Sequence, residues 1–157
     1  MDKQSWALAP EASEKSMAKD RFKISLRLRH PSLDPNEISN AFGINPTFSW
    51  ISGSRAGPVI QKWNVWYGLL AEGVGGDEYE EALKNSVLLL ESGKEWLKDV
   101  FESEGELDVI FAYWSDLNEG KIFQTDFYPE FFARLSNLKA GMQLEVWRDD
   151  TDERASN

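Results

Sequence analysis

The chain has 157 residues, 41% of them hydrophobic, and its 27 acidic and 17 basic side chains give a formal net charge of −10. This length and composition predict one globular domain with a sizeable core, while the net charge argues against a nucleic-acid partner and against binding to an anionic membrane. The absence of cysteine excludes disulfides, thiolate catalysis and cysteine-based metal sites.

Two terminal segments differ from the rest of the chain. Residues 1–20 mix Ser, Ala, Glu and Lys without a period, and residues 149–157 are polar and acidic. We therefore expect a mobile arm and a frayed tail around a single domain over residues 21–148. The N-terminus lacks the apolar stretch of a signal peptide, and no apolar run is long enough to span a membrane. A cytoplasmic protein is therefore expected.

The first half of the domain predicts a strand, a short helix and a long connection. Apolar and polar residues alternate over residues 22–29, which predicts a half-buried strand. Asp34 and Pro35 suit the start of a helix that Gly43 ends. Its expected buried side chains are Ile38, Ala41 and Phe42. Residues 44–62 are interrupted by proline and glycine, which predicts an irregular connection.

The second half predicts more strands and helices. A strand over residues 63–70 precedes a glycine turn at 73–76, and Asp77 is expected to cap the next helix, which Gly93 interrupts. Strands over 107–114 and 122–127 are expected to form a hairpin. Pro129 opens the last helix, and a strand over 142–147 follows.

This order of elements predicts an α+β fold. We expect a five-stranded antiparallel or mixed sheet with about three helices packed on one face. A ferredoxin-like arrangement is the closest familiar layout, and the strand order is left open.

Common catalytic and metal-binding patterns are missing from the sequence. His30 is the one histidine, so no multi-histidine metal site can form, and no G-x-S-x-G motif supports a serine triad. Residues 73–76 lack the third glycine of a dinucleotide fingerprint, and acids follow them where a phosphate would sit. We expect no cofactor, no metal and no enzyme activity, although a carboxylate-only site stays open.

The aromatic content in and beside residues 44–62 is the most unusual feature. Long ordered loops are often functional, and Trp, Tyr and Arg are enriched at binding hot spots. Two alternatives stay open: these side chains contact a partner or ligand, or they pin the loop to the sheet. The candidate binding residues are Trp50, Arg55, Trp63, Trp66, His30 and Phe48.

Several short motifs match one family pattern. They are Arg29-His30-Pro31-Ser32-Leu33-Asp34-Pro35, Glu37-Ile38, Phe42-Gly43-Ile44, Pro46, Trp50, Gly53, Trp66 and the closing helix over residues 131–138. With these motifs the body, over most of residues 22–147, resembles a bacterial family called domain of unknown function 4279. The resemblance implies an α+β domain with no assigned activity, and it carries over no catalytic residues.

Two function hypotheses follow from these observations. The first is a non-enzymatic protein-binding module, such as an immunity protein that neutralises a cognate basic toxin through acidic-surface docking. The alternative is a small-ligand or peptide sensor that uses the Trp-rich loop and strand over residues 44–66. A protein partner is therefore expected, and the oligomeric state is left open.

Overall fold

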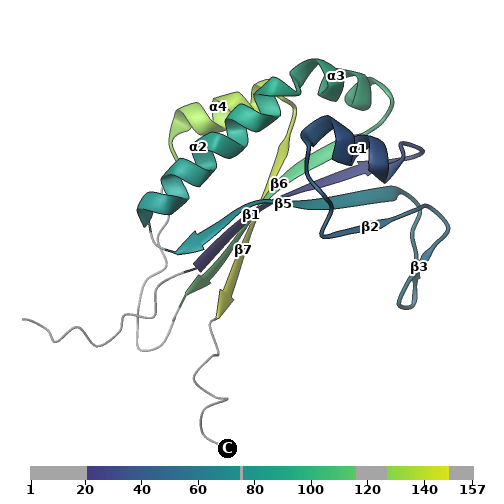
Figure 1. Ribbon diagram of the computed structural model, residues 1–157, viewed down its shortest axis with the longest axis horizontal. Coiled ribbons are helices and arrows are strands. Elements are labelled where there is room, and N and C mark those ends of the chain that lie inside the picture. The colour runs from purple at the N-terminus through teal and green to yellow at the C-terminus, as the bar shows by residue number, and fades with distance from the viewer. Residues whose placement is uncertain (1–20, 75, 116–126, 149–157) are drawn as a thin grey trace, which may run out of the picture.

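A mixed sheet with helices on one side forms the body of the protein (Figure 1). The computed structural model describes residues 21–74, 76–115 and 127–148. The predicted α+β class and five-stranded sheet are confirmed. The sheet has the order β2-β5-β1-β6-β7, formed by β1 (Arg21–His30), β2 (Phe48–Trp50), β5 (Asn64–Val74), β6 (Glu106–Ser115) and β7 (Gly141–Arg148).

Four helices and a small hairpin complete the described part. The helices are α1 (Pro35–Phe42), α2 (Gly76–Ser92), α3 (Lys94–Glu102) and α4 (Pro129–Asn137), and the hairpin pairs β3 (Arg55–Ala56) with β4 (Val59–Ile60). None of these helices is long and apolar enough to cross a membrane.

Strand β1 is the centre of the sheet. It pairs antiparallel with β5 on one side and with β6 on the other, whereas β6 and β7 are parallel. A parallel pair needs a crossover, and α4 lies in that connection. The parallel β6–β7 pair distinguishes this sheet from a ferredoxin-like one, in which all neighbouring strands are antiparallel. The alternation predicted for β1 holds: its buried side chains facing the helices are Phe22, Ile24, Leu26 and Leu28.

Helix α1 begins and ends where its sequence predicts. The Asp34 side chain accepts a hydrogen bond from the Asn36 N–H at 2.8 Å, and Gly43 ends the helix at φ +66°. Ile38 and Phe42 are buried, but Ala41 is exposed, so its predicted burial is wrong. The inner face follows the i, i+4 spacing of Ile38 and Phe42, and Ala41 lies beside it.

Strand β5 is longer than predicted. It runs to Val74 because it pairs along all of β1, so Gly73 lies within the strand instead of a turn. A Cβ at Gly73 would meet a Phe22 ring atom at 2.9 Å, so close packing favours glycine there. Helix α2 begins at Gly76, which makes Asp77 its second residue and not its cap.

The predicted irregular connection contains ordered strands. Residues 44–62 hold β2, which is the fifth strand of the sheet, and the β3–β4 hairpin. Strands of two or three residues are too short to show a hydrophobic alternation, so the sequence does not predict them. The predicted strand over residues 122–127 lies outside the described residues except for Phe127, which is not in a strand. The predicted N-terminal arm (residues 1–20) and the predicted C-terminal tail (residues 149–157) also lie outside the described residues.

An ion pair joins α2 to α4. Arg134 donates from Nε to Glu91 Oε1 at 2.7 Å and from Nη2 to Oε2 at 2.6 Å. This hydrogen bonding lowers the pKa of Glu91, although partial desolvation raises it in part. Because the folded-state pKa is lowered, the stabilisation is present at neutral pH and is lost as the pH falls through that pKa.

We expect Glu91→Gln to lower the melting temperature by about 1–3 °C at pH 7, because the pair is partly exposed and surface pairs contribute little. The difference from wild type should shrink as the pH falls through the lowered pKa of Glu91, because the wild-type carboxyl then becomes protonated. Thermal unfolding followed by circular dichroism at pH 7 and at successively lower pH values measures it. Glu102→Gln, at the more exposed Lys98–Glu102 pair, is the control. A difference that persists at low pH would contradict this account.

Candidate functional site

The sheet has one side that no described helix covers, and we call it the open face (Figure 1). Side chains alternate along a strand, and directly paired residues of neighbouring strands point to the same side. The polar positions of β1 therefore lie on the open face, opposite the buried Phe22, Ile24, Leu26 and Leu28. The register then places one row of side chains across three strands, from Phe48 through Tyr67 to Arg27.

Three aromatic rings lie together at the β2 end of the open face, and we call them the aromatic platform: Phe48, Trp50 and Tyr67. The Phe48 and Tyr67 rings are stacked, with centroids 4.5 Å apart and an interplanar angle of 17°. The Trp50 centroid is 4.6 Å from that of Phe48. Phe48 is 39% exposed, and the other two are partly exposed. Stacking orders these rings before any partner arrives, which lowers the entropy cost of binding.

An ion-pair network borders the platform on β1 and β6. Arg27 donates to Asp108 Oδ2 from Nη2 at 2.8 Å and from Nε at 3.2 Å. Arg29 Nη2 lies 2.6 Å from Glu106 Oε2 and 3.6 Å from Asp108 Oδ2. Two guanidinium groups and two carboxylates balance each other here, so the centre of the open face is polar but not strongly acidic.

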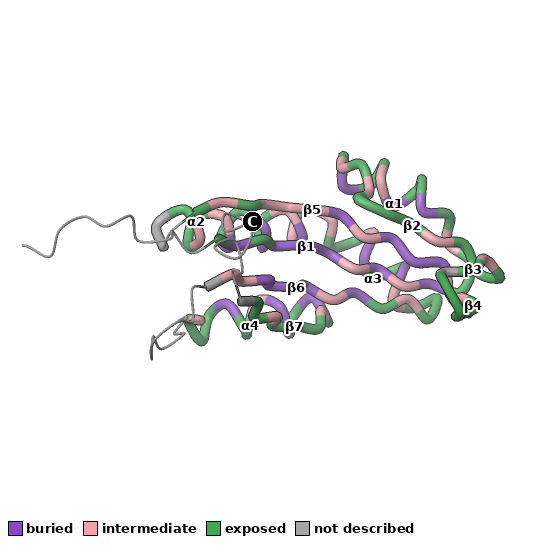
Figure 2. The backbone as a smooth tube through the Cα atoms, turned by 90° about the horizontal axis from the view of Figure 1, so that it is seen from below, coloured by how far each residue is buried: buried purple, intermediate pink, exposed green. Residues whose placement is uncertain are grey.

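A hairpin projects beyond the sheet at the same end, and we call residues 51–62 the arm (Figure 2). Next to the β3–β4 pair, the two sides of the arm are joined by hydrogen bonds from Gly53 N–H to Gln61 O at 2.8 Å and from Gln61 N–H to Ser54 O at 3.0 Å. Gly57 turns the chain at φ +62°, a conformation that favours glycine. The exposed apolar side chains of the arm are Ile51 at 60%, Val59 at 57% and Ile60 at 58%.

One buried asparagine anchors the arm to the domain. Asn64 Oδ1 accepts from the Ser52 N–H at 2.7 Å, and its Nδ2 donates to Leu33 O at 3.0 Å. The base of the arm is therefore held between β5 and the segment before α1. An anchored hairpin can present its exposed apolar side chains in a defined position.

Of the six candidate residues predicted from the sequence, four lie at the surface and two, Trp66 and His30, are buried. Phe48 and Trp50 belong to the platform, Arg55 is exposed in the arm, and Trp63 is partly exposed in the bend before β5. Trp66 is 0% exposed and its indole Nε1 donates to Ser39 Oγ at 2.9 Å.

His30 is also buried. It is 5% exposed, and its Nδ1 accepts from the backbone N–H groups of Ser32 and Leu33 at 3.0 and 2.8 Å. Trp66 and His30 therefore stabilise the interior and do not reach the surface.

Tyr67 and the arginines of β1 were not among the candidates. The alternation in β1 did place Arg27 and Arg29 on a solvated face, but their neighbours depend on the strand register.

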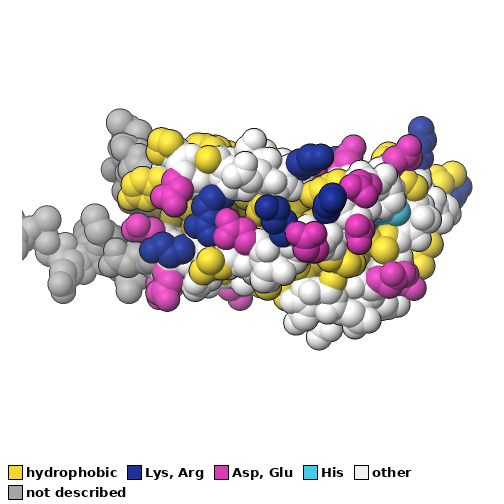
Figure 3. Space-filling view, turned by 90° about the horizontal axis from the view of Figure 1, so that it is seen from above, with side chains coloured by type: hydrophobic (Ala, Val, Ile, Leu, Met, Phe, Trp, Pro, Cys, Tyr) yellow, Lys and Arg dark blue, Asp and Glu magenta, His cyan; other side chains and the backbone are white. Residues whose placement is uncertain are grey.

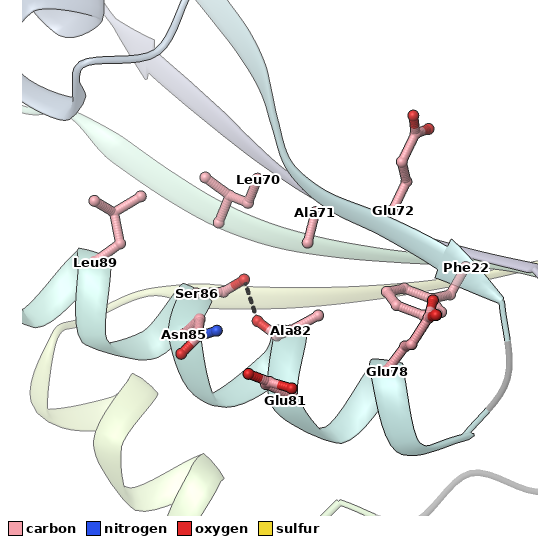
Figure 4. A pocket seen from close by; sticks show the side chains of 10 residues that line it. All are labelled: Phe22, Leu70, Ala71, Glu72, Glu78, Glu81, Ala82, Asn85, Ser86 and Leu89. Carbon is pink, nitrogen blue, oxygen red and sulfur yellow. Dashed lines mark hydrogen bonds between the residues drawn. The ribbon is translucent and has the colours of Figure 1, made fainter.

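A pocket of about 460 Å³ lies between α2 and β5 (Figure 4). Helix α2 lies at the other end of the molecule from the arm (Figure 2). Three glutamates line the pocket, but Figure 4 shows that Glu72 points away from α2, while Glu78 turns toward Phe22. Glu78 Oε2 accepts from the Val74 N–H at 3.0 Å and so caps the end of β5. The carboxylates of this pocket do not converge on one point. Among the described residues, no three His, Asp or Glu side chains are grouped to hold a metal ion.

Charges of both signs are interspersed on the surface seen from above in Figure 3. Acidic and basic side chains alternate there, with hydrophobic side chains between them. The acidity of the chain is therefore not gathered into one field on this side.

Comparison with known families matches nearly the whole described body. A family model with the description Domain of unknown function (DUF4279) matches residues 20–149. The matched region runs from β1 to β7 and contains the platform, the arm and the pocket. No curated protein and no solved structure matches the chain.

Proposed function

The chain belongs to the DUF4279 family, and from that premise and the geometry of the open face we propose that it is a non-enzymatic protein-binding module. The observation that carries the proposal is the adjacency of the aromatic platform and the arm. Aromatic and arginine side chains are enriched among the residues that dominate binding energy at protein interfaces, and the exposed aliphatic side chains of the arm add apolar area beside them.

The shape of this surface favours a protein partner over a small ligand. Small-molecule sites are concave and bury most of the ligand. The arm instead projects outward (Figure 1), and its Ile60 side chain is 58% exposed. An extended apolar projection beside a flat aromatic surface fits the scale of a protein interface.

The charge of the chain favours a basic partner. A net charge of −10 attracts a basic protein at long range and speeds its encounter, while the platform and the arm provide the short-range contacts. An immunity protein that neutralises a basic toxin in the cytoplasm has this combination of properties. Its docking would rest on the platform, with the net charge acting as a steering field.

We expect Trp50→Ala to weaken partner binding by about 30-fold, since truncation of an interface hot-spot aromatic typically removes about 2 kcal/mol. The test co-expresses the chain with the product of the adjacent gene, scores rescue of growth, and measures the affinity of the purified pair by calorimetry. Leu88→Ser removes an apolar side chain that is 51% exposed on α2, away from the platform, and should leave the affinity unchanged.

The outcomes separate the hypotheses. Loss of binding in Trp50→Ala but not in Leu88→Ser supports the proposal. Equal affinity in both variants would place the interface elsewhere. A metabolite that changes tryptophan fluorescence in wild type but not in Trp50→Ala, with no protein partner, would favour the small-ligand or peptide sensor.

A further inference from the structure

The two edges of the sheet are built differently. An exposed strand edge invites pairing with another chain, and proteins limit this with short edge strands, bulges, charges or a covering helix. At the β5 side, β2 has only three residues. β2 covers only part of β5, and the rest of β5 forms the edge. There, the pairing of β5 with β1 has a register shift between Ile24 and Ser25, and helix α2 runs alongside β5 (Figure 4). That edge is protected in three of these ways.

The β7 edge is less protected, because it is long and regular and its charged residues are limited to Glu145 and Arg148. The pairing of β6 with β7 is regular over eight residues, from Gly141 to Arg148, without a bulge. β7 contains no proline and no lysine. None of the residues 141–147 of β7 is buried (Figure 2). Its hydrophobic side chains are exposed: Met142 at 38%, Leu144 at 43%, Val146 at 43% and Trp147 at 51%.

We propose that β7 pairs antiparallel with β7 of a second copy of this chain, so that the two sheets join into one. A perpendicular two-fold axis keeps the helices of both copies on the same side. The side chains of β7 that face the helices then oppose the corresponding side chains of the second copy. Met142, Leu144 and Val146 are these side chains, because they pair with the buried or half-buried Val109, Phe111 and Tyr113.

One register suits the sequence of β7. If Leu144 lies on the two-fold axis, it faces the second Leu144, and Met142 faces Val146. On the open face, Gln143 faces Glu145, which opposes a neutral amide to a carboxylate. If the two-fold axis instead passed through Glu145, the two Glu145 side chains would lie directly opposite each other, and like charges in that position are destabilising. If the axis passed through Gln143, Val146 would face Ala140, which lies outside β7.

The polar side of β7 is already ordered for this register. Gln143 Nε2 donates to Glu145 Oε1 at 2.8 Å, and Arg27 Nη2 donates to Gln143 Oε1 at 3.2 Å. Trp147 Nε1 donates to Glu145 Oε2 at 3.2 Å. The network from Asp108 through Arg27 therefore ends at the edge with a carboxylate that accepts hydrogen bonds. Since β2 and β7 are opposite edges of the sheet, the dimer leaves both platforms free.

The oligomeric state tests the proposal. Analytical ultracentrifugation of the full chain from about 1 to 200 μM should show a monomer–dimer equilibrium that approaches twice 17.9 kDa. Leu144→Lys should weaken dimerisation at least tenfold while the circular dichroism spectrum stays unchanged, because an edge lysine blocks strand pairing. Leu88→Lys, at a side chain 51% exposed on α2, should dimerise like wild type.

Cross-linking tests the register. The chain has no cysteine, so single-cysteine variants report one position each. Directly opposed residues of antiparallel strands have Cα atoms about 4.5–5.5 Å apart, within the range that a disulfide spans. Leu144→Cys should therefore oxidise rapidly to a disulfide dimer. Glu145→Cys should not, because its Cα would lie about 8 Å from its counterpart, two residues out of register.

A monomer at all concentrations would overturn the proposal. So would a dimer that Leu144→Lys leaves intact, or equal cross-linking of Leu144→Cys and Glu145→Cys. The outcome is independent of the binding experiment on Trp50, because the platform lies at the opposite edge.

Discussion

Trp66→Ala is expected to lower the free energy of unfolding by about 3–5 kcal/mol, the usual cost of deleting a large buried aromatic side chain. Trp66 is 0% exposed, and its ring centroid lies 5.9 Å from that of Phe42 on α1. It also donates a hydrogen bond to Ser39 Oγ at 2.9 Å. The indole thus joins α1 to the sheet. A domain of this size has about 5–15 kcal/mol of stability in total, so the variant loses a large part of it.

Gly68 provides a matched test of the same packing. The indole ring of Trp66 lies directly over Gly68, and a Cβ there would meet ring atom Cη2, with Cζ2 and Cζ3 each at 2.7 Å. Gly68→Ala should therefore destabilise the wild type by about 1–3 kcal/mol through overpacking. In a Trp66→Leu background the same change should cost much less, because the ring is gone. Urea unfolding of the four proteins in a double-mutant cycle measures this coupling.

Two results would contradict this account of Trp66. One is a cost below about 1 kcal/mol for Trp66→Ala, which would mean that the site collapses around the deletion. The other is additivity of the two substitutions, which would mean that the glycine is required for a reason other than the indole. Trp66→Phe should lie between wild type and Trp66→Ala, because it keeps a ring but loses the hydrogen bond to Ser39.

His30→Ala is expected to cost about 2–4 kcal/mol, because it removes the acceptor of two backbone N–H groups. Nδ1 of His30 accepts from Ser32 and Leu33, so the ring proton lies on Nε2 and donates to Ser103 Oγ at 3.0 Å. One imidazole therefore joins the end of β1, the turn before α1 and the end of α3. Without it, the two N–H groups of the turn lose their partner.

His30→Asn is the control for this prediction. An asparagine side-chain oxygen can replace Nδ1 as an acceptor but does not reach Ser103, so this variant should recover about half of the loss. Chemical unfolding with matched m-values gives the comparison. Equal stability of His30→Ala and wild type would mean that water satisfies the turn, and His30 would then contribute only packing.

Much of the fold was predictable because the patterns involved are local. The alternation over residues 22–29, the cap formed by Asp34 and the termination at Gly43 each depend on neighbouring residues only. Four features were missed: the extension of β5 to Val74, the start of α2 at Gly76, the exposure of Ala41, and the short strands within residues 44–62. β5 and the short strands depend on partners far along the chain, and the side of α1 that is buried depends on how the helix packs against the sheet.

The candidate site was only partly predictable for the same reason. The sequence identified Phe48 and Trp50 by residue type, but it grouped them with Trp66, which points into the core. Which side of β5 faces the helices depends on its register with β1, and a shift by one residue would exchange the two faces. Tyr67 entered the platform through that register alone.

The sequence by itself determined the α+β class, the family, and the lack of cysteine and of multi-histidine chemistry, because these depend on composition and on local patterns. Only the tertiary structure decided the strand order, the aromatic platform on the open face and the long, regular β7 edge. The physical reason is that a side chain's surroundings are set by long-range pairing. Arg27 and Asp108 are 81 residues apart in the chain, yet they are hydrogen-bonded neighbours in the sheet.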